Sequence, residues 1–205
     1  MIITYHGLGM VKMQVGDTVV AASPIGKGGD SKVPRFGADL VLVPLADQGW
    51  NGVDNMSYGD RVPFLADGPG EYEVSGVFIR GVGSEGPNGK INTIYTLNLD
   101  SLNICHLGAL AQAELSDEAL EAIGVVDVLF LPAGDYGTIP PKAAAKIAAA
   151  IAPKLVIPIA YDSAATLNNF LKELGETSAT KTDKLTIKRR DLEGKEGEVV
   201  IINAS

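Results

Sequence analysis

The chain has 205 residues and a formal net charge of −8. An acidic chain repels a phosphate backbone unless its basic residues are strongly segregated, so we expect no nucleic-acid binding. Its apolar runs are too short to cross a bilayer and its first residues do not resemble an export signal, so we expect a cytoplasmic protein that does not bind membranes. The single cysteine, Cys105, excludes an intramolecular disulfide and a multi-cysteine zinc site.

The first half of the chain predicts a β-rich region. Short apolar segments are separated by glycine, proline, aspartate and asparagine, which favour turns. The expected strands cover residues 18–22, 40–43, 77–82, 93–97 and 102–105. The glycine-rich stretch 26–30 fits a flexible turn between strands, although its backbone N–H groups and lysine could also bind an anion.

The second half predicts helices that alternate with buried strands. Ser116 is a plausible N-cap for a first helix, Pro140 and Pro141 begin a second, alanine-rich helix that runs to residue 151, and Asp162 with Ser163 caps a third. Between them, residues 125–131 and 154–159 are apolar with little alternation, which is typical of strands buried on both faces. The sheet should therefore be covered by helices.

The end of the chain predicts a closing hairpin, formed by residues 184–190 and 198–202 around a charged, glycine-containing turn at 193–197. Basic side chains alternate with apolar ones in its first strand, so we interpret this cluster as the solvated face of an edge strand. No linker or repeat divides the sequence, and we expect one domain over residues 1–205.

Five segments in order resemble the small metallo-β-lactamase-fold hydrolases, the family that includes bacterial metal-dependent hydrolases and ascorbate-lactonase-like proteins. They are the strand 38–43, the Pro-Gly-Glu-Tyr-Glu hairpin beginning at residue 69, the strand pair ending in His106-Leu107-Gly108, and the two apolar strands that end at Pro132 and near Pro158. This resemblance implies an α+β fold, an αββα four-layer sandwich, in which loops at the strand ends hold two metal ions.

The same resemblance shows which metal ligands are missing. The family's HxHxDH motif corresponds here to residues 45–50, which read Leu-Ala-Asp-Gln-Gly-Trp, so Asp47 is the one possible ligand left in it. Ser84 and Glu85 stand where a histidine is expected, and Ala109 and Ala160 replace the bridging aspartate and the last histidine. The early Gly-His-Ser turn is also altered, to Gly7-Leu8-Gly9-Met10. Because alanine, leucine and glycine side chains donate no lone pair, we expect the zinc or manganese site to be lost and no cofactor to be bound.

Our leading interpretation is a non-catalytic member of the fold that serves as a binding or assembly module for a small molecule or a protein. The former active-site mouth is where a ligand would bind, and its candidate residues are Asp47, Trp50, Ser84, Glu85, His106 and Tyr161. Trp50 could plug the former cavity or form a stacking wall for a ligand. His106 fits a hydrogen-bonded structural role, with functional work as the second interpretation.

Two other possibilities stay open. A hydrolase could have rebuilt its chemistry at the same rim, with His106 and Asp47 as the first candidate residues and Glu85, Asp135 and Asp162 as further ones. A self-assembling protein is the other possibility, and exposed sheet edges or an apolar surface patch would favour a homo-oligomer.

Overall fold

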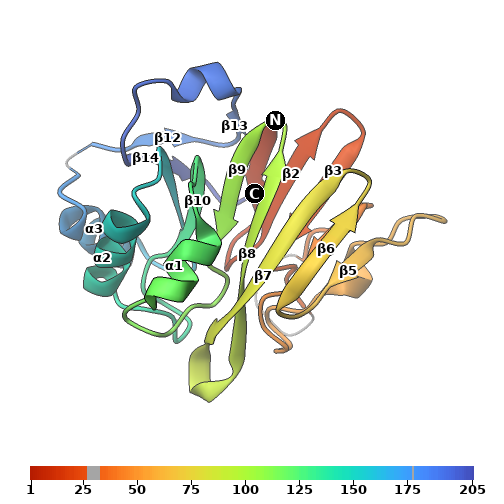
Figure 1. Cartoon of the computed structure of the whole chain (residues 1–205), viewed down its shortest axis with the longest axis horizontal. Coiled ribbons are helices and arrows are strands. Elements are labelled where there is room, and N and C mark those ends of the chain that lie inside the picture. The colour runs from red at the N-terminus through yellow and green to blue at the C-terminus, as the bar shows by residue number, and fades with distance from the viewer. Residues whose placement is uncertain (27–32, 177) are drawn as a thin grey trace.

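Two β-sheets packed face to face form the centre of the molecule (Figure 1). The computed structural model describes residues 1–26, 33–176 and 178–205. The possible anion-binding turn at residues 26–30 therefore lies, apart from Gly26, outside the described residues. No helix in the described ranges is long and apolar enough to cross a membrane.

The first sheet has six strands in the order β13-β1-β2-β3-β4-β5. The strands β1, β2 and β3 form an antiparallel meander, and β4 and β5 continue parallel to β3. Their bounds are β1 Ile2–Tyr5, β2 Val11–Val15, β3 Thr18–Ala22, β4 Leu40–Leu42, β5 Phe64–Ala66 and β13 Leu185–Thr186.

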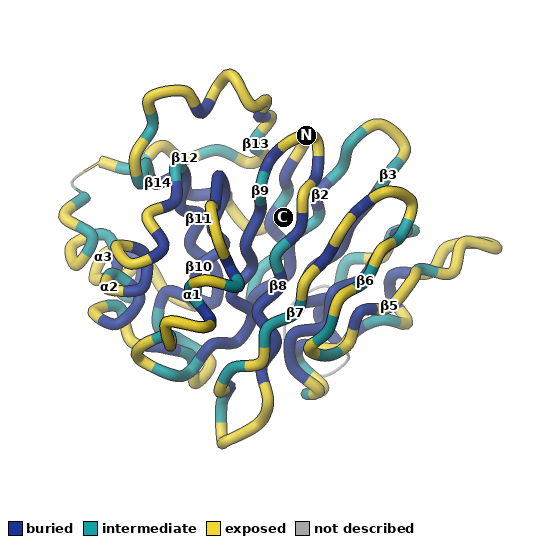
Figure 2. The backbone as a smooth tube through the Cα atoms, in the orientation of Figure 1, coloured by how far each residue is buried: buried dark blue, intermediate teal, exposed yellow. Residues whose placement is uncertain are grey.

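The second sheet has eight strands in the order β12-β14-β11-β10-β9-β8-β7-β6. It is antiparallel from β6 to β9 and parallel from β9 to β12. Its strands are β6 Gly70–Val74, β7 Val77–Glu85, β8 Ile91–Leu99, β9 Leu102–His106, β10 Val128–Pro132, β11 Leu155–Ile159, β12 Thr180–Thr182 and β14 Glu198–Ile202. The predicted buried strands are confirmed as β10 and β11, which are buried along their whole length (Figure 2).

Three helices lie over the outer face of the eight-stranded sheet, α1 Asp117–Ile123, α2 Pro141–Ile151 and α3 Ala164–Glu173 (Figure 1). The predicted caps form, because Ser116 Oγ accepts from the Ala119 N–H at 3.2 Å and Ser163 Oγ from the Thr166 N–H at 3.1 Å. The remaining helical turns are η1 Val53–Asn55, η2 Pro87–Gly89 and η3 Arg189–Leu192.

The outer face of the six-stranded sheet has a different cover. Apolar side chains of β3 and β4 pack there against two irregular segments, one that contains Ala38 before β4 and one that contains η1 and Met56 after it. Loop structure therefore takes the place of α-helix on this side in the described part of the chain. The predicted α+β sandwich is confirmed, with its α-helices gathered on one outer face.

The predicted closing hairpin is wrong. Leu185 and Thr186 form β13, which pairs with β1 in the six-stranded sheet, and residues 189–192 form the turn η3. Strand β14 instead inserts between β11 and β12 and runs parallel to both. The four residues at 199–202 are buried on both faces of the sheet. An interior position between parallel strands buries all four apolar side chains, whereas a two-stranded hairpin would leave one of its faces exposed.

Tyr95 connects the two sheets through the core. Its hydroxyl is buried and lies 3.0 Å from the Val43 carbonyl and 2.9 Å from the Ala66 carbonyl, at the ends of β4 and β5. Both carbonyls belong to the opposite sheet, so this one donor fixes the distance between the layers at this point.

We predict that Tyr95→Phe lowers the free energy of unfolding by about 1–3 kcal/mol, because the buried Val43 carbonyl loses its donor, whereas the Ala66 carbonyl keeps the Val43 N–H at 2.8 Å. Urea denaturation measures the change, and Tyr58→Phe, at a tyrosine that is 76% exposed, is the matched control. Equal stability of the two variants would contradict the role assigned to the Tyr95 hydroxyl.

Candidate functional site

The loop after β4 corresponds to the family's metal-binding motif. Leu45 is buried and forms an isolated β-bridge with Asn92 of β8. The chain then turns, because the Asp47 N–H donates to the Leu45 carbonyl at 2.8 Å and the Trp50 N–H donates to the Asp47 carbonyl at 2.9 Å. The turn directs Leu45 and Trp50 into the core and leaves Asp47 at the surface.

Trp50 fills the space beside the first loop of the chain. Its indole is 4% exposed, and a Cβ atom added to Gly9 would lie 2.3 Å from its Cζ3 atom. The ring therefore packs directly on the Gly9 backbone, at a distance that only glycine permits. Of the two interpretations of Trp50, this geometry favours the plug, since a buried ring has no free face on which a ligand could stack.

His106 is buried behind this contact. Its Nε2 lies 3.0 Å from the Gly9 carbonyl, and its Nδ1 lies 3.0 Å from the Gly108 N–H. The carbonyl can only accept and the amide can only donate, so the ring is neutral with its proton on Nε2. Burial lowers its pKa to about 4. Both ring nitrogens form hydrogen bonds with backbone groups, which fits the structural role predicted for His106.

The two alanines at former ligand positions are also buried in the core between the sheets. The Ala109 N–H donates to Asn92 Oδ1 at 2.7 Å, and the Ala160 N–H donates to the Leu8 carbonyl. Ala160 adopts a φ of 53° to do so. Backbone groups thus connect these positions to neighbouring loops, and neither alanine has a side chain that could bind a metal.

Asn92 was missed by the sequence interpretation. Its amide nitrogen donates to Ser84 Oγ at 2.8 Å and to the Leu107 carbonyl at 2.9 Å, while its oxygen accepts from Ala109. One buried side chain therefore joins β7, β8 and the loop after β9. Asparagine in a strand is disfavoured on propensity grounds, but this strand also contains Asn98, which is exposed, so the residue type alone did not single out Asn92.

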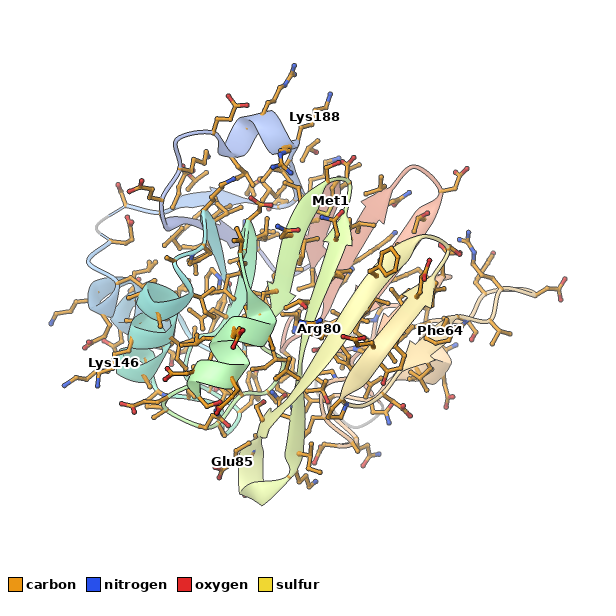
Figure 3. All side chains as sticks on the ribbon, viewed as in Figure 1. Met1, Phe64, Arg80, Glu85, Lys146 and Lys188 are labelled. Atoms are coloured by element: carbon orange, nitrogen blue, oxygen red, sulfur yellow. The ribbon has the colours of Figure 1, made fainter. Side chains whose placement is uncertain are left out.

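The other predicted ligand-binding residues are spread around the rim. Asp47 forms an ion pair with Lys90, and the hydrogen bonds from Lys90 and from the Gly49 N–H lower the pKa of its carboxyl. Glu85 is exposed at the end of β7, beside the tip of the β7–β8 hairpin (Figure 3). Its backbone N–H binds Gln112 Oε1 at 2.9 Å, and its carboxylate is free to contact solvent.

Tyr161, Asp135 and Asp162 lie where the loops after β10 and β11 meet. The Tyr161 ring packs against Tyr5 with 6.0 Å between centroids. The Asp162 N–H donates to Asp135 Oδ2 at 2.8 Å, and the hydrogen bond between the two carboxyl groups raises the pKa of Asp162. Of the five residues proposed for a rebuilt hydrolase, these two aspartates are brought together, whereas His106 is buried with both nitrogens bound.

The donor set does not fit the metal centre that the fold implies. The positions corresponding to ligands hold Leu45, Asp47, Gly49, Trp50, Ala109 and Ala160. Across the described residues, no group of three or more His, Cys, Asp or Glu side chains could hold a metal ion. A zinc site needs three or four such donors, and a pair of remote ones does not replace them.

We predict that Gly9→Ala lowers the free energy of unfolding by about 1–3 kcal/mol, because the new methyl group overlaps the indole of Trp50. Gly68→Ala is the matched control, since an added Cβ there has nothing within 4 Å. The two sites are coupled, so Gly9→Ala should cost much less in a Trp50→Ala background. Additive losses in this double-mutant cycle would contradict direct packing.

We also predict that neutral His106 makes stability depend on pH. Its folded-state pKa of about 4 is below the ordinary value of 6.5, so the unfolded chain takes up the proton first as pH falls. The contribution is complete above about pH 6.5 and is lost towards about pH 4, at up to about 1.4 kcal/mol per pH unit.

Urea denaturation between pH 7 and pH 4.5 measures this slope in the wild type and in His106→Gln. The variant should have the shallower slope. His6→Gln is the control at the other histidine, whose pKa is also lowered by burial but which is only partly buried. If His106→Gln left the slope unchanged, the histidine would not be the group that titrates.

Comparison with known proteins agrees with this fold. A family model described as a beta-lactamase superfamily domain matches residues 2–160. A search of curated proteins gave no match. Among solved structures, a proposed Zn-dependent hydrolase of the metallo-beta-lactamase superfamily from Thermotoga maritima is 26% identical with a TM-score of 0.79, over 98% of this chain and 97% of that one.

More distant structures share the fold. A proposed metal-dependent hydrolase from Parabacteroides distasonis is 15% identical with a TM-score of 0.69, over 99% of this chain and 93% of that one. A metallo hydrolase from Ignicoccus hospitalis is 14% identical with a TM-score of 0.65, over 100% and 95%. The match of the family model over most of the sequence, together with these structures, shows that the chain belongs to the beta-lactamase superfamily domain family.

Proposed function

We propose that this protein is a non-catalytic member of its family that serves as a binding or assembly module. The observation that carries the proposal is the filling of the former metal centre. Leu45, Trp50, Ala109 and Ala160 all belong to the apolar core that lies between the two sheets. A site that has become part of the core is neither open to substrate nor supplied with donors.

The chemistry of the family explains why this filling matters. Two metal ions would lower the pKa of a bound water and polarise the bond to be cleaved. Here Asp47 is the remaining donor of the first motif, and its carboxylate binds Lys90. His106 could ligate a metal only after losing a backbone hydrogen bond in a buried site, which costs about 1–3 kcal/mol for each group left unpaired.

Burial of the former metal centre also restricts where a partner can bind. Trp50 and His106, two of the residues expected at the former mouth, are buried, so a small molecule could not touch them without unpacking the core. Asp47 and Ser84 are partly exposed and Glu85 is exposed, so these three remain accessible at the rim. We therefore propose that a partner binds the outer surface of the sandwich, since a shared fold does not fix where a protein binds its partner.

The hydrolase names of the structural neighbours belong to those proteins. The scaffold is shared, and the proposal rests on the residues in which this chain departs from the family's metal-binding pattern. The contact between the carboxyl groups of Asp135 and Asp162 is the one feature that favours a rebuilt hydrolase. The Thr166 hydroxyl donates to Asp135 Oδ1 at 3.3 Å, but the imidazole of His106 is buried with both nitrogens bound to backbone, so the non-catalytic role is the better supported.

We predict that protein purified without chelator holds far less than one metal ion per chain, and that incubation with zinc, manganese or iron leaves its melting temperature unchanged. A metal that bound the folded state would raise the melting temperature by mass action. Elemental analysis and thermal denaturation measure the two quantities.

Asp47→Ala tests whether any bound metal occupies the former centre. Asp67→Ala is the control, at an exposed aspartate outside that centre. Near-stoichiometric metal that is retained by Asp67→Ala and lost in Asp47→Ala would overturn the proposal and restore a hydrolase. Hydrolysis of ester, lactone or phosphodiester probes above the buffer rate, abolished by Asp135→Asn, would equally overturn it.

A further inference from the structure

The eight-stranded sheet ends in two open edges. Strand β6 forms one edge and β12 forms the other, on opposite sides of the molecule (Figure 1). The backbone groups of β6 that point away from β7 have no backbone partner among the described residues. An unpaired row of N–H and C=O groups is a template for another strand unless charge or cover prevents pairing.

The β6 edge carries acidic side chains on its helix-side face. Glu71 pairs in register with Arg80, Arg80 with Thr96, and Thr96 with Cys105. Residues directly paired across strands point to the same face, and Cys105 lies in the core beneath the helices. Glu71 therefore faces the helix side, and so does Glu73, two residues along the strand. Arg80 partly neutralises Glu71 at 2.9 Å.

The β12 edge carries a basic side chain on that same face. Lys181 pairs in register with Ile201 of β14, and Ile201 belongs to the core beneath the helices. Further exposed basic residues lie in the adjoining segment, at Lys184, Lys188, Arg189 and Arg190. Asp183 and Asp191 lie in the same segment and accept from Asn203 Nδ2 and from the Lys188 N–H, each at 2.8 Å. Both carboxylates keep their charge, and the basic side chains of residues 181–191 outnumber them.

Apolar side chains flank the β6 edge. Phe78 pairs in register with Glu73 and is 63% exposed, and Phe64 of β5 is 42% exposed and contacts Tyr72 of β6 edge-on at 6.1 Å. Phe64 lies at this end of the molecule, well separated in the view from Lys188 of the basic segment (Figure 3). Exposed aromatic rings beside an open edge are typical of a surface that contacts protein.

A symmetric contact of β6 with β6 is disfavoured by charge. Antiparallel pairing centred on Tyr72 would place Glu71 of one copy opposite Glu73 of the other, twice. Pairing of β6 with β12 instead places the acidic strand beside Lys181 on the same face. The observations thus favour a second copy of this chain as the partner, bound by its other edge.

We propose that copies of this chain associate head to tail, with the β6 edge of one copy paired to the β12 edge of the next, so that the eight-stranded sheet continues between copies. Such a contact joins two different surfaces and leaves one free edge at each end, so association grows into a ring or a filament. The inference names the partner for the assembly role and rests on the proposed function in that respect. The surfaces lie away from the filled metal centre, so a wild type that stays monomeric overturns this contact and leaves the metal-content and hydrolysis tests of the proposed function unaffected.

The test is a charge exchange measured by sedimentation velocity at low salt over a range of protein concentrations. We predict that the mass of the wild type increases with concentration and that salt reverses the increase, because the contact is partly ionic. The variant E71K/E73K and the variant K181E should each remain monomeric alone, since each brings like charges together. Mixed in equal amounts they should assemble again, because each acidic edge then meets a basic one.

The control is D54K/E114K, which changes the net charge by the same amount as E71K/E73K at exposed residues away from both edges. It should assemble like the wild type. Recovery on mixing also shows that the separate variants are folded. A wild type that stays monomeric at all concentrations, a dimer that does not grow, or failure of the mixture to assemble would overturn the inference.

Discussion

The contact between the Trp50 indole and the Gly9 backbone organises the end of the sandwich where the family has its metals. Because Gly9 has no side chain, the ring can lie on its backbone while its carbonyl accepts from His106. The preceding residue, Leu8, accepts from Ala160 and from the Tyr5 hydroxyl. The first loop is thereby attached to the ends of β9 and β11. Apolar packing and backbone hydrogen bonds here join the strand-end loops that metal ligation would otherwise join.

This replacement has an energetic consequence for the polar groups left behind. His106 and Asn92 are buried, and each satisfies its donors and acceptors with protein partners. A satisfied buried network is rigid, and breaking one bond leaves a group without water or protein to replace it. Recovery of a metal site would require ligands to be added, Trp50 to be removed and these bonds to be broken together. The filled state is consequently separated from a catalytic one by several coupled changes.

The sequence predicted the features that depend on local signals. The caps at Ser116 and Ser163 and the apolar runs of β10 and β11 are encoded within a few residues, and the comparison of ligand positions with the family showed that donors were missing. The tail was predicted wrongly because the partner of a strand is a non-local choice, and the alternation around Leu185 fits β1 as well as β14. The role of Asn92 depends on Ser84, Leu107 and Ala109, which lie up to 17 positions away and meet only in the fold.

Because the former metal centre is filled, the open edges of the eight-stranded sheet are surfaces that remain available to a partner, and their charges decide which partner fits. Charged residues on an edge strand ordinarily prevent a sheet from pairing with its copies. In this chain Glu71 and Glu73 on one edge and Lys181 on the other have opposite sign and share a face. Repulsion then acts between like edges and attraction between unlike ones, so the charges select one mode of pairing as they exclude the others. With its former metal centre filled, the fold uses the charges at its sheet edges to select the strand with which it pairs.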